Sequence, residues 1–186
     1  MKSSFRSHRS SRPRLLAAAS MAAAGCLVLL TGATAARAEA LDAAKAFERL
    51  KGLQGRWEGT GGEAGKPGDP LVVEYAVTAG GHAVMEKVFA GQPHEMVTVF
   101  TLDGDDLIAT HYCSGGNQPH YKFKPGTKPN EVAMDFDGGT SLDLSKDAFI
   151  HDVRYDLGTD GKVRAELTNY AMGKAAGKVE FQLERK

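Results

Sequence analysis

Apolar and polar residues alternate in short segments over most of the chain after Pro70, and turn motifs rich in Gly, Asp and Pro separate these segments. A period of two is typical of β-strands, because successive side chains point to opposite faces of a sheet. The alternating segments cover residues 71–77, 82–89, 132–136, 149–155, 163–170 and 179–183, and the central stretch 94–123 contains three more. With a strand that starts near Trp57, the pattern predicts about ten short strands.

Residues 41–54 show a different spacing. Ala44, Phe47 and Leu50 recur at every third position, which fits one face of an α-helix. Asp42 is suited to the first turn of such a helix, because its side chain can accept from free backbone N–H groups. The sequence therefore predicts one N-terminal helix before the first strand.

The predicted fold class is all-β, a closed antiparallel meander barrel of about ten strands with one N-terminal helix. Short turns between consecutive strands favour antiparallel neighbours, since a parallel connection needs a long crossover. Closure of the sheet removes its exposed edges. A barrel of this size has an interior that is filled by side chains or holds one small ligand.

Two glycine-containing turns set the expected strand register in the central stretch. Asp103-Gly104 between apolar runs is a strong hairpin signal, and a two-residue turn there would place Val99 opposite Ile108. A two-residue turn at Gly115-Gly116 would place Cys113 opposite Gln118 and His111 opposite His120. Because side chains alternate, this register assigns each residue to a face of the sheet, and a slip of one residue would exchange the faces.

The expected register gives two faces, and the sequence does not decide which of them is inside the barrel. One face is the more uniformly apolar and carries Glu95, Val97, Val99, Ile108, Thr110, Tyr112, Tyr121 and Phe123. The second turns polar toward the Gly-Gly end and carries Met96, Thr98, Phe100, Leu107, Ala109, His111, Cys113, Gln118, His120 and Lys122.

Residues 1–38 have the pattern of a secretory signal peptide. A basic segment without acidic residues precedes the apolar run Leu15–Leu30, and Ala36-Arg37-Ala38 is a cleavage motif. We therefore expect a periplasmic or secreted protein, cleaved near Ala38, with residues 39–186 as a single barrel domain. Lipidation of Cys26 is a less favoured alternative. The apolar run is shorter than a membrane-spanning helix needs, so no span is expected.

Removal of the signal changes the charge. The chain has 23 basic and 23 acidic residues, and six of the basic ones precede Glu39, which leaves 17 − 23 = −6. An acidic domain has no electrostatic reason to bind nucleic acid. Oligomeric state stays open.

The segment GRWEGTG, residues 55–61, resembles the G-x-W opening of lipocalin-like (calycin) barrels and the longer opening motif of nitrobindin-type haem barrels. The central EMVTVFTLDGDDLIATHYCSGGNQP resembles a stretch in secreted bacterial proteins of unknown function from the same lipocalin-like superfamily. The resemblance implies a barrel with Trp57 at one end. Nitrobindin-type barrels hold haem through a histidine in the closing strand, but this chain has no histidine after His151. We therefore expect neither haem nor another cofactor.

The central stretch gathers most of the candidate chemistry. His111 and Cys113 lie two apart on one strand, a spacing that allows a shared metal ion or a thiol activated by imidazole. The simpler interpretation is a buried cysteine beside a hydrogen-bonded histidine, with no metal. Candidate ligand-binding residues are Glu86, Glu95, His111, Tyr112, Cys113, Asn117, Gln118, His120 and Tyr121.

Glu86 and Glu95 stand in otherwise apolar strands. A carboxylate that points inward requires a partner, because an unpaired buried charge is costly, and Tyr112, Tyr121 or Arg154 would be suitable. The sequence thus predicts a barrel that binds a small apolar or amphipathic molecule. The alternatives are an enzyme that uses Cys113 with His111, or a Glu with a Tyr, and a disfavoured haem or metal protein.

Overall fold

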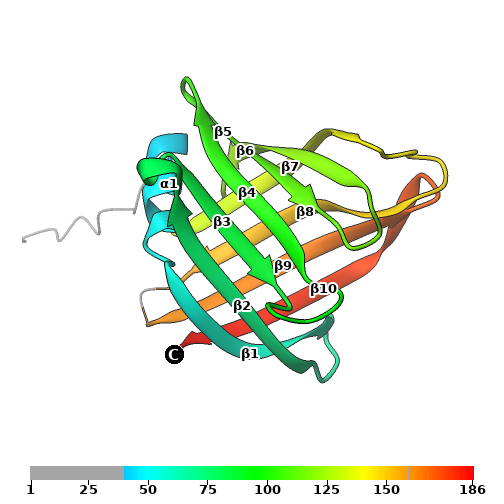
Figure 1. Cartoon of the computed structure of the whole chain (residues 1–186), viewed down its shortest axis with the longest axis horizontal. Helices are drawn as coiled ribbons and strands as arrows, with labels where there is room; N and C mark the ends of the chain where they lie inside the picture. Colours follow the sequence, from blue (N-terminus) through cyan, green and yellow to red (C-terminus); the bar gives the residue numbers. More distant parts are fainter. Residues whose placement is uncertain (1–39, 159) are drawn as a thin grey trace, which may run out of the picture. The chain divides into compact units, whose positions relative to one another are not determined.

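The computed structural model describes residues 40–158 and 160–186, and within them the strands form a closed barrel (Figure 1). The expected all-β antiparallel meander barrel is confirmed, and it is consistent with a lipocalin-like barrel. The elements are α1 (Ala43–Lys51), β1 (Gly55–Glu63), β2 (Asp69–Thr78), a 3-10 turn (Ala79–Gly81), β3 (Ala83–Val88), β4 (Met96–Asp103), β5 (Asp106–Tyr112), β6 (Gln118–Pro125), β7 (Glu131–Thr140), β8 (Ala148–Leu157), β9 (Lys162–Ala171) and β10 (Lys174–Arg185).

Closure occurs between the first and last strands. Each strand pairs with its neighbours in sequence, and β1 pairs antiparallel with both β2 and β10. The glycines of β1 permit a close approach there: a Cβ atom on Gly59 would lie 1.8 Å from the carbonyl oxygen of Gln182 on β10. The Gly-rich opening of the strand therefore has a steric role in closing the barrel.

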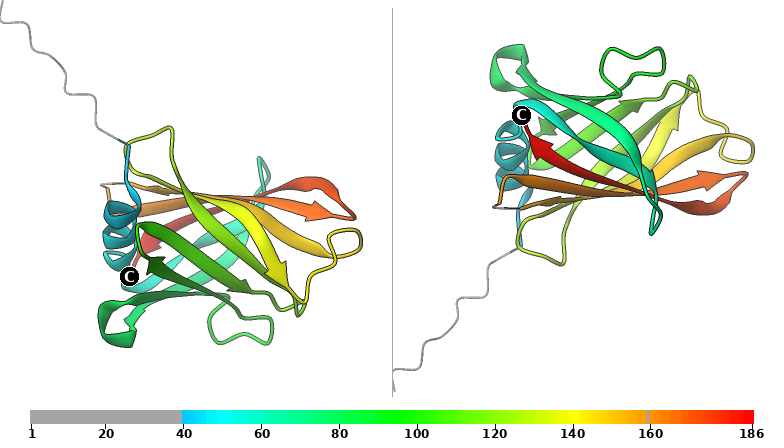
Figure 2. Two further views of the ribbon diagram at one scale, coloured as in Figure 1. Left: turned by 90° about the horizontal axis from the view of Figure 1, so that it is seen from above. Right: turned by 90° about the horizontal axis from the view of Figure 1, so that it is seen from below.

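The helix α1 lies across one end of the barrel (Figure 2). Asp42 caps it by accepting from the N–H of Lys45 at 2.7 Å, as the sequence predicts, but the helix ends at Lys51 rather than at Gln54. Its buried side chains join the core, as does Trp57, whose Nε1 donates to the carbonyl of Leu53 at 2.7 Å. Helix and Trp57 together fill this end.

The other end of the barrel, away from α1, carries the loops 89–95, 113–117 and 141–147, and we call it the far end. In a meander, alternate connections lie at opposite ends, so β5 runs from the helix end to the far end. His111, near the end of β5, is therefore close to the far end.

The first central hairpin differs in register from the expectation but keeps its faces. Val99 pairs with Thr110 rather than with Ile108, because the turn residues are Gly104-Asp105 instead of Asp103-Gly104. The change equals two residues along the partner strand, so no side chain changes face. The interior face is the one that carries Thr98, Phe100, Leu107, Ala109 and His111.

The second register expectation was wrong by one residue. Ala109 pairs with Tyr121, and Thr110 pairs with His120. Because the slip is odd, the whole of β6 changes face relative to the expectation: Tyr121 and Phe123 are buried in the core, while His120 and Lys122 lie on the outer side. His111 and His120 consequently point to opposite sides of the sheet.

The predicted signal peptide, the cleavage near Ala38 and the lipidation of Cys26 lie outside the described residues. Within the described part, no helix has the length and apolar character that a membrane span requires.

Candidate functional site

A row of polar residues crosses four neighbouring strands inside the barrel. Tyr75 on β2 pairs directly with Glu86 on β3, Glu86 pairs with Thr98 on β4, and Thr98 pairs with His111 on β5. All four side chains are buried. Direct cross-strand partners on one face lie close enough for their side chains to interact, so the register itself assembles this polar row in an otherwise apolar interior.

Glu86 is the centre of the row. Its Oε1 accepts from the hydroxyl of Tyr75 at 2.6 Å, and its Oε2 accepts from the hydroxyl of Tyr155 at 3.1 Å. Tyr155 belongs to β8, which is five steps from β3 in either direction around the ten-strand ring. The contact therefore spans the interior of the barrel, and at this level side chains fill it.

Burial governs the protonation of this group. Removal from water raises the pKa of the Glu86 carboxyl, while hydrogen bonds from Tyr75, Tyr155 and Thr98 oppose that rise. Burial also raises the pKa of the Tyr75 and Tyr155 hydroxyls, and the neighbouring carboxylate raises it further. Both tyrosines are therefore neutral hydrogen-bond donors.

His111 ends the row near the far end. Its Nδ1 lies 2.9 Å from the hydroxyl of Thr98, and only 4% of the residue is exposed. Burial lowers the pKa of the imidazole to about 4, so the ring is neutral near pH 7. Among the described residues, the other ring nitrogen, Nε2, has no hydrogen-bond partner.

A small cavity of about 20 Å³ adjoins this imidazole. Its wall is mainly apolar, and His111 and the hydroxyl-bearing Thr98, Tyr121 and Tyr155 supply its polar groups. The hydroxyl of Tyr121 already donates to the carbonyl of Ile150 at 2.7 Å. A volume of this size accommodates about one water molecule. A larger hollow of about 630 Å³ over β1, β2, β9 and β10 contains none of the residues of the polar row.

Of the residues singled out from the sequence, Glu86, His111 and Tyr121 reach the interior. Tyr121 and His111 line the same cavity. The tyrosine and arginine partners expected for Glu86 are not the ones that it contacts, because Tyr75 and Tyr155 fill that role. Arg154 instead pairs with Asp135.

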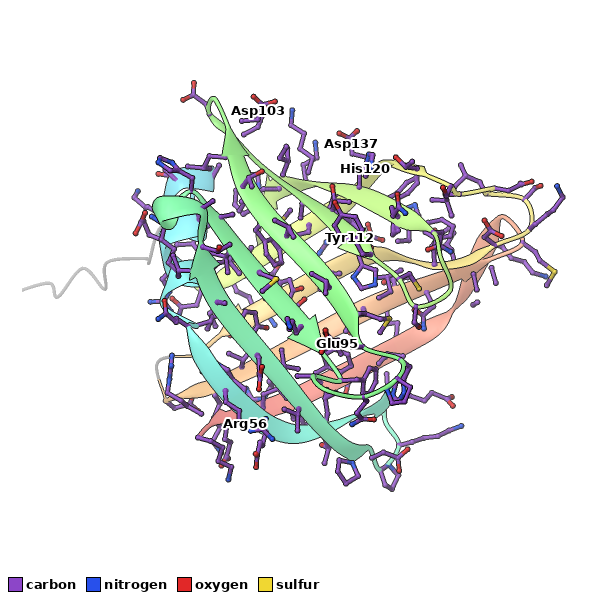
Figure 3. The ribbon with its side chains drawn as sticks, viewed as in Figure 1. Arg56, Glu95, Asp103, Tyr112, His120 and Asp137 are labelled. Atoms are coloured by element: carbon purple, nitrogen blue, oxygen red, sulfur yellow. The ribbon has the colours of Figure 1, made fainter. Side chains whose placement is uncertain are left out.

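Four other candidates lie at the outer surface or the rim of the barrel. Tyr112 is 49% exposed, and His120 approaches Thr140 at 3.2 Å (Figure 3). Glu95 accepts from the N–H of Gly91 at 2.8 Å, which lowers the pKa of its carboxyl, and Gln118 pairs with β7. None of these four side chains lines the interior cavity.

Cys113 and Asn117 belong to the loop between β5 and β6. The thiol of Cys113 accepts a 3.4 Å hydrogen bond from the N–H of Gly115, and the residue is half-buried. Asn117 is buried and donates to the carbonyl of Ala148 at 3.0 Å, which ties the loop to β8. Asn117 therefore has a structural contact here, and Cys113 lies outside the set of residues around the cavity.

Sequence reasoning missed Tyr75, Thr98 and Tyr155. Tyr75 and Thr98 stand on the same face as Glu86 and His111, so a correct register of β2 to β5 would have found them. Tyr155 gave no local signal, because it meets Glu86 only after the barrel has closed.

The arrangement offers an apolar space with a neutral imidazole at its wall. Groups of three or more His, Cys, Asp or Glu that would suit a metal ion are absent from the part of the chain that the structure describes. A comparison with protein-family models finds no match, and a comparison with curated proteins finds none either.

Proposed function

We propose that this protein is a small-molecule-binding barrel that takes an apolar or amphipathic ligand into its interior beside His111. The closed barrel is compatible with such a role. The observation that carries the proposal is the Nε2 atom of His111, which is buried and lacks a partner within the described chain, on a residue that lines a mainly apolar cavity. A buried polar atom without a hydrogen bond is costly, and a ligand that supplies one removes that cost.

The size of the cavity limits the ligand. The helix end is filled by α1 and Trp57, and the Glu86–Tyr155 contact crosses the interior, so the cavity beside His111 is small. About 20 Å³ is less than any organic molecule needs, and entry therefore requires side chains to move. Met96 and Ile150 line the cavity and are only partly buried. Methionine adapts its shape readily, which suits it to this role.

Native mass spectrometry of protein purified from its own host tests the proposal directly. The expected result is a population with the mass of one small organic molecule added. A two-dimensional NMR titration with benzene, phenol and 1-hexanol gives the second test. Signals of His111 and Met96 should shift on addition, while those of exposed Arg56 on the outer face should not (Figure 3). A protein that carries no adduct and shows no shifts with any of these probes would remove the binding function.

Export is the second part of the proposal. It is supported by the basic segment, the apolar run and the cleavage motif in residues 1–38. Cell fractionation with N-terminal sequencing provides the test. The expected product begins with Glu39 in the periplasm or medium, whereas a lipidated N-terminus at Cys26 would favour the lipoprotein alternative.

A further inference from the structure

The polar row leads from the Glu86 carboxylate through Thr98 to His111 at the cavity. Tyr75 and Tyr155 donate to the two oxygens of Glu86 at 2.6 and 3.1 Å. Thr98 is the direct cross-strand partner of Glu86 and helps to lower the pKa of that carboxyl, and its hydroxyl lies 2.9 Å from Nδ1 of His111. Thr98 thus connects the carboxylate to the imidazole.

The direction of these hydrogen bonds follows from the groups involved. The hydrogen bonds that Tyr75 and Tyr155 donate to the two oxygens of Glu86 favour its ionised form over the protonated one. We infer that Thr98 directs its one proton to its cross-strand partner Glu86, because an ionised carboxylate only accepts and attracts a neighbouring donor. The hydroxyl oxygen of Thr98 then accepts from His111, which places the imidazole proton on Nδ1.

A neutral imidazole that carries its proton on Nδ1 presents a lone pair at Nε2. His111 lines the cavity and its Nε2 has no partner in the described chain, so the complement of this lone pair is a hydrogen-bond donor in the cavity. A carboxylate ligand would meet the lone pair with a like partial charge, and the lining residues include no Lys or Arg to compensate it. Protonation of the imidazole would admit an anion, but burial opposes that near neutral pH.

We propose that the barrel selects small neutral ligands with an O–H group, such as phenols and alcohols, over carboxylate anions, and that Nε2 of His111 accepts the hydrogen bond of the ligand. This inference rests on the proposed binding function and specifies the ligand class. Glu86 and Thr98 act as positioning residues, because they fix the tautomer of His111 and do not contact the ligand themselves.

The test compares phenol with toluene, which has nearly the same shape but a methyl group in place of the hydroxyl, and with benzoate. NMR titration measures the binding free energy of each compound to the protein of residues 39–186. The free energy of transferring that compound from water to an apolar solvent is then subtracted. Phenol should bind about tenfold more tightly than toluene, the value of one buried hydrogen bond, and benzoate should not compete at pH 7.

Two variants test whether His111 and Thr98 cause the preference for phenol over toluene. His111→Leu should abolish the preference for phenol while toluene still binds, and Thr98→Val should reduce it because the tautomer is no longer fixed. Thr110→Val is the matched control, since Thr110 directly precedes His111 on β5 and points to the outer face. It should retain the wild-type preference.

Nitrogen NMR of the imidazole in the wild-type protein supplies a readout that does not depend on the folding of any variant. A proton on Nδ1 and a shift of the Nε2 resonance on addition of phenol are expected. A proton on Nε2 in the free protein, a metal bound at Nε2, equal binding of phenol and toluene, or a preference that survives in His111→Leu would each overturn the inference. In the last two cases binding itself would stand, whereas failure of all three probes to bind would remove the proposed function.

Discussion

The hydroxyl of Tyr75 on β2 donates a 2.6 Å hydrogen bond to Oε1 of Glu86, its direct partner on β3. Tyr155 reaches the same carboxylate from β8 on the opposite side of the ring. A buried carboxylate is tolerated when it is hydrogen-bonded, and here the donors come from both sides of the barrel. The contact therefore links two opposite walls of the barrel and occupies part of the interior between them.

Tyr75→Phe removes the shorter of these hydrogen bonds and leaves one oxygen of a buried carboxylate with fewer donors. We expect it to lower the free energy of unfolding by about 2 kcal/mol, and Tyr155→Phe, at 3.1 Å, by about 1 kcal/mol. Urea denaturation measures both. Tyr112→Phe is the control, because 49% of Tyr112 is exposed, and it should have no measurable effect. Equal losses in all three variants would contradict the assigned role of Glu86.

The buried imidazole of His111 should make stability depend on pH. Its pKa is about 4 in the folded protein and 6.5 in the unfolded chain, so the unfolded state binds a proton first as the pH falls. Stability should therefore decrease from pH 6.5 down to about 4, by about 3 kcal/mol in total, and no further below that. The raised pKa of Glu86 works against this loss of stability. Above pH 4.5 the folded state retains a proton that the unfolded state releases, so this carboxyl by itself makes stability increase as the pH falls toward 4.5.

His111→Gln isolates this contribution, because the variant keeps Glu86, Tyr121 and Tyr155, which are buried titratable groups of the same interior. The difference in unfolding free energy between wild type and variant should shrink as the pH is lowered from 7 to 4.5. Parallel curves in urea titrations at several pH values would show that the imidazole is protonated equally in both states.

Gly59→Ala tests the closure of the barrel. A Cβ atom at this position would lie 1.8 Å from the backbone oxygen of Gln182, and backbone cannot move aside as a side-chain tip can. We expect a loss of about 3 kcal/mol or failure to fold, seen by thermal denaturation and circular dichroism. Gly62→Ala on the same strand is the control: its nearest contact would be 3.1 Å, and the loss should be clearly smaller.

Cys113→Ser distinguishes a binding protein from an enzyme that depends on the thiol. The thiol accepts only a weak 3.4 Å hydrogen bond from Gly115 and does not line the cavity. The substitution should change stability by less than about 0.5 kcal/mol and leave phenol binding unchanged. Loss of binding, or rapid labelling of Cys113 by a thiol reagent at pH 6, would instead indicate a reactive cysteine.

Local patterns in the sequence were sufficient for the elements and for the fold class. Alternation identified the strands, the spacing of Phe47 and Leu50 identified α1, and short turns implied an antiparallel meander. The inward position of Glu86 could not be decided from the sequence, since alternation separates the two faces of a strand but does not say which is buried. Burial of the Glu86 carboxylate depends on a hydrogen-bond donor from the opposite wall of the barrel, here Tyr155.

By itself, the sequence determined the period of each strand and the presence of a carboxylate and an imidazole in apolar segments, because these are properties of neighbouring residues. Tertiary structure decided the rest. The loop 113–117 places Ala109 rather than its neighbour opposite Tyr121, and this one-residue difference puts Tyr121 and Phe123 in the core and His120 outside. The contact between Glu86 and Tyr155 exists only because β1 meets β10, which brings strands distant in sequence to opposite sides of one small interior.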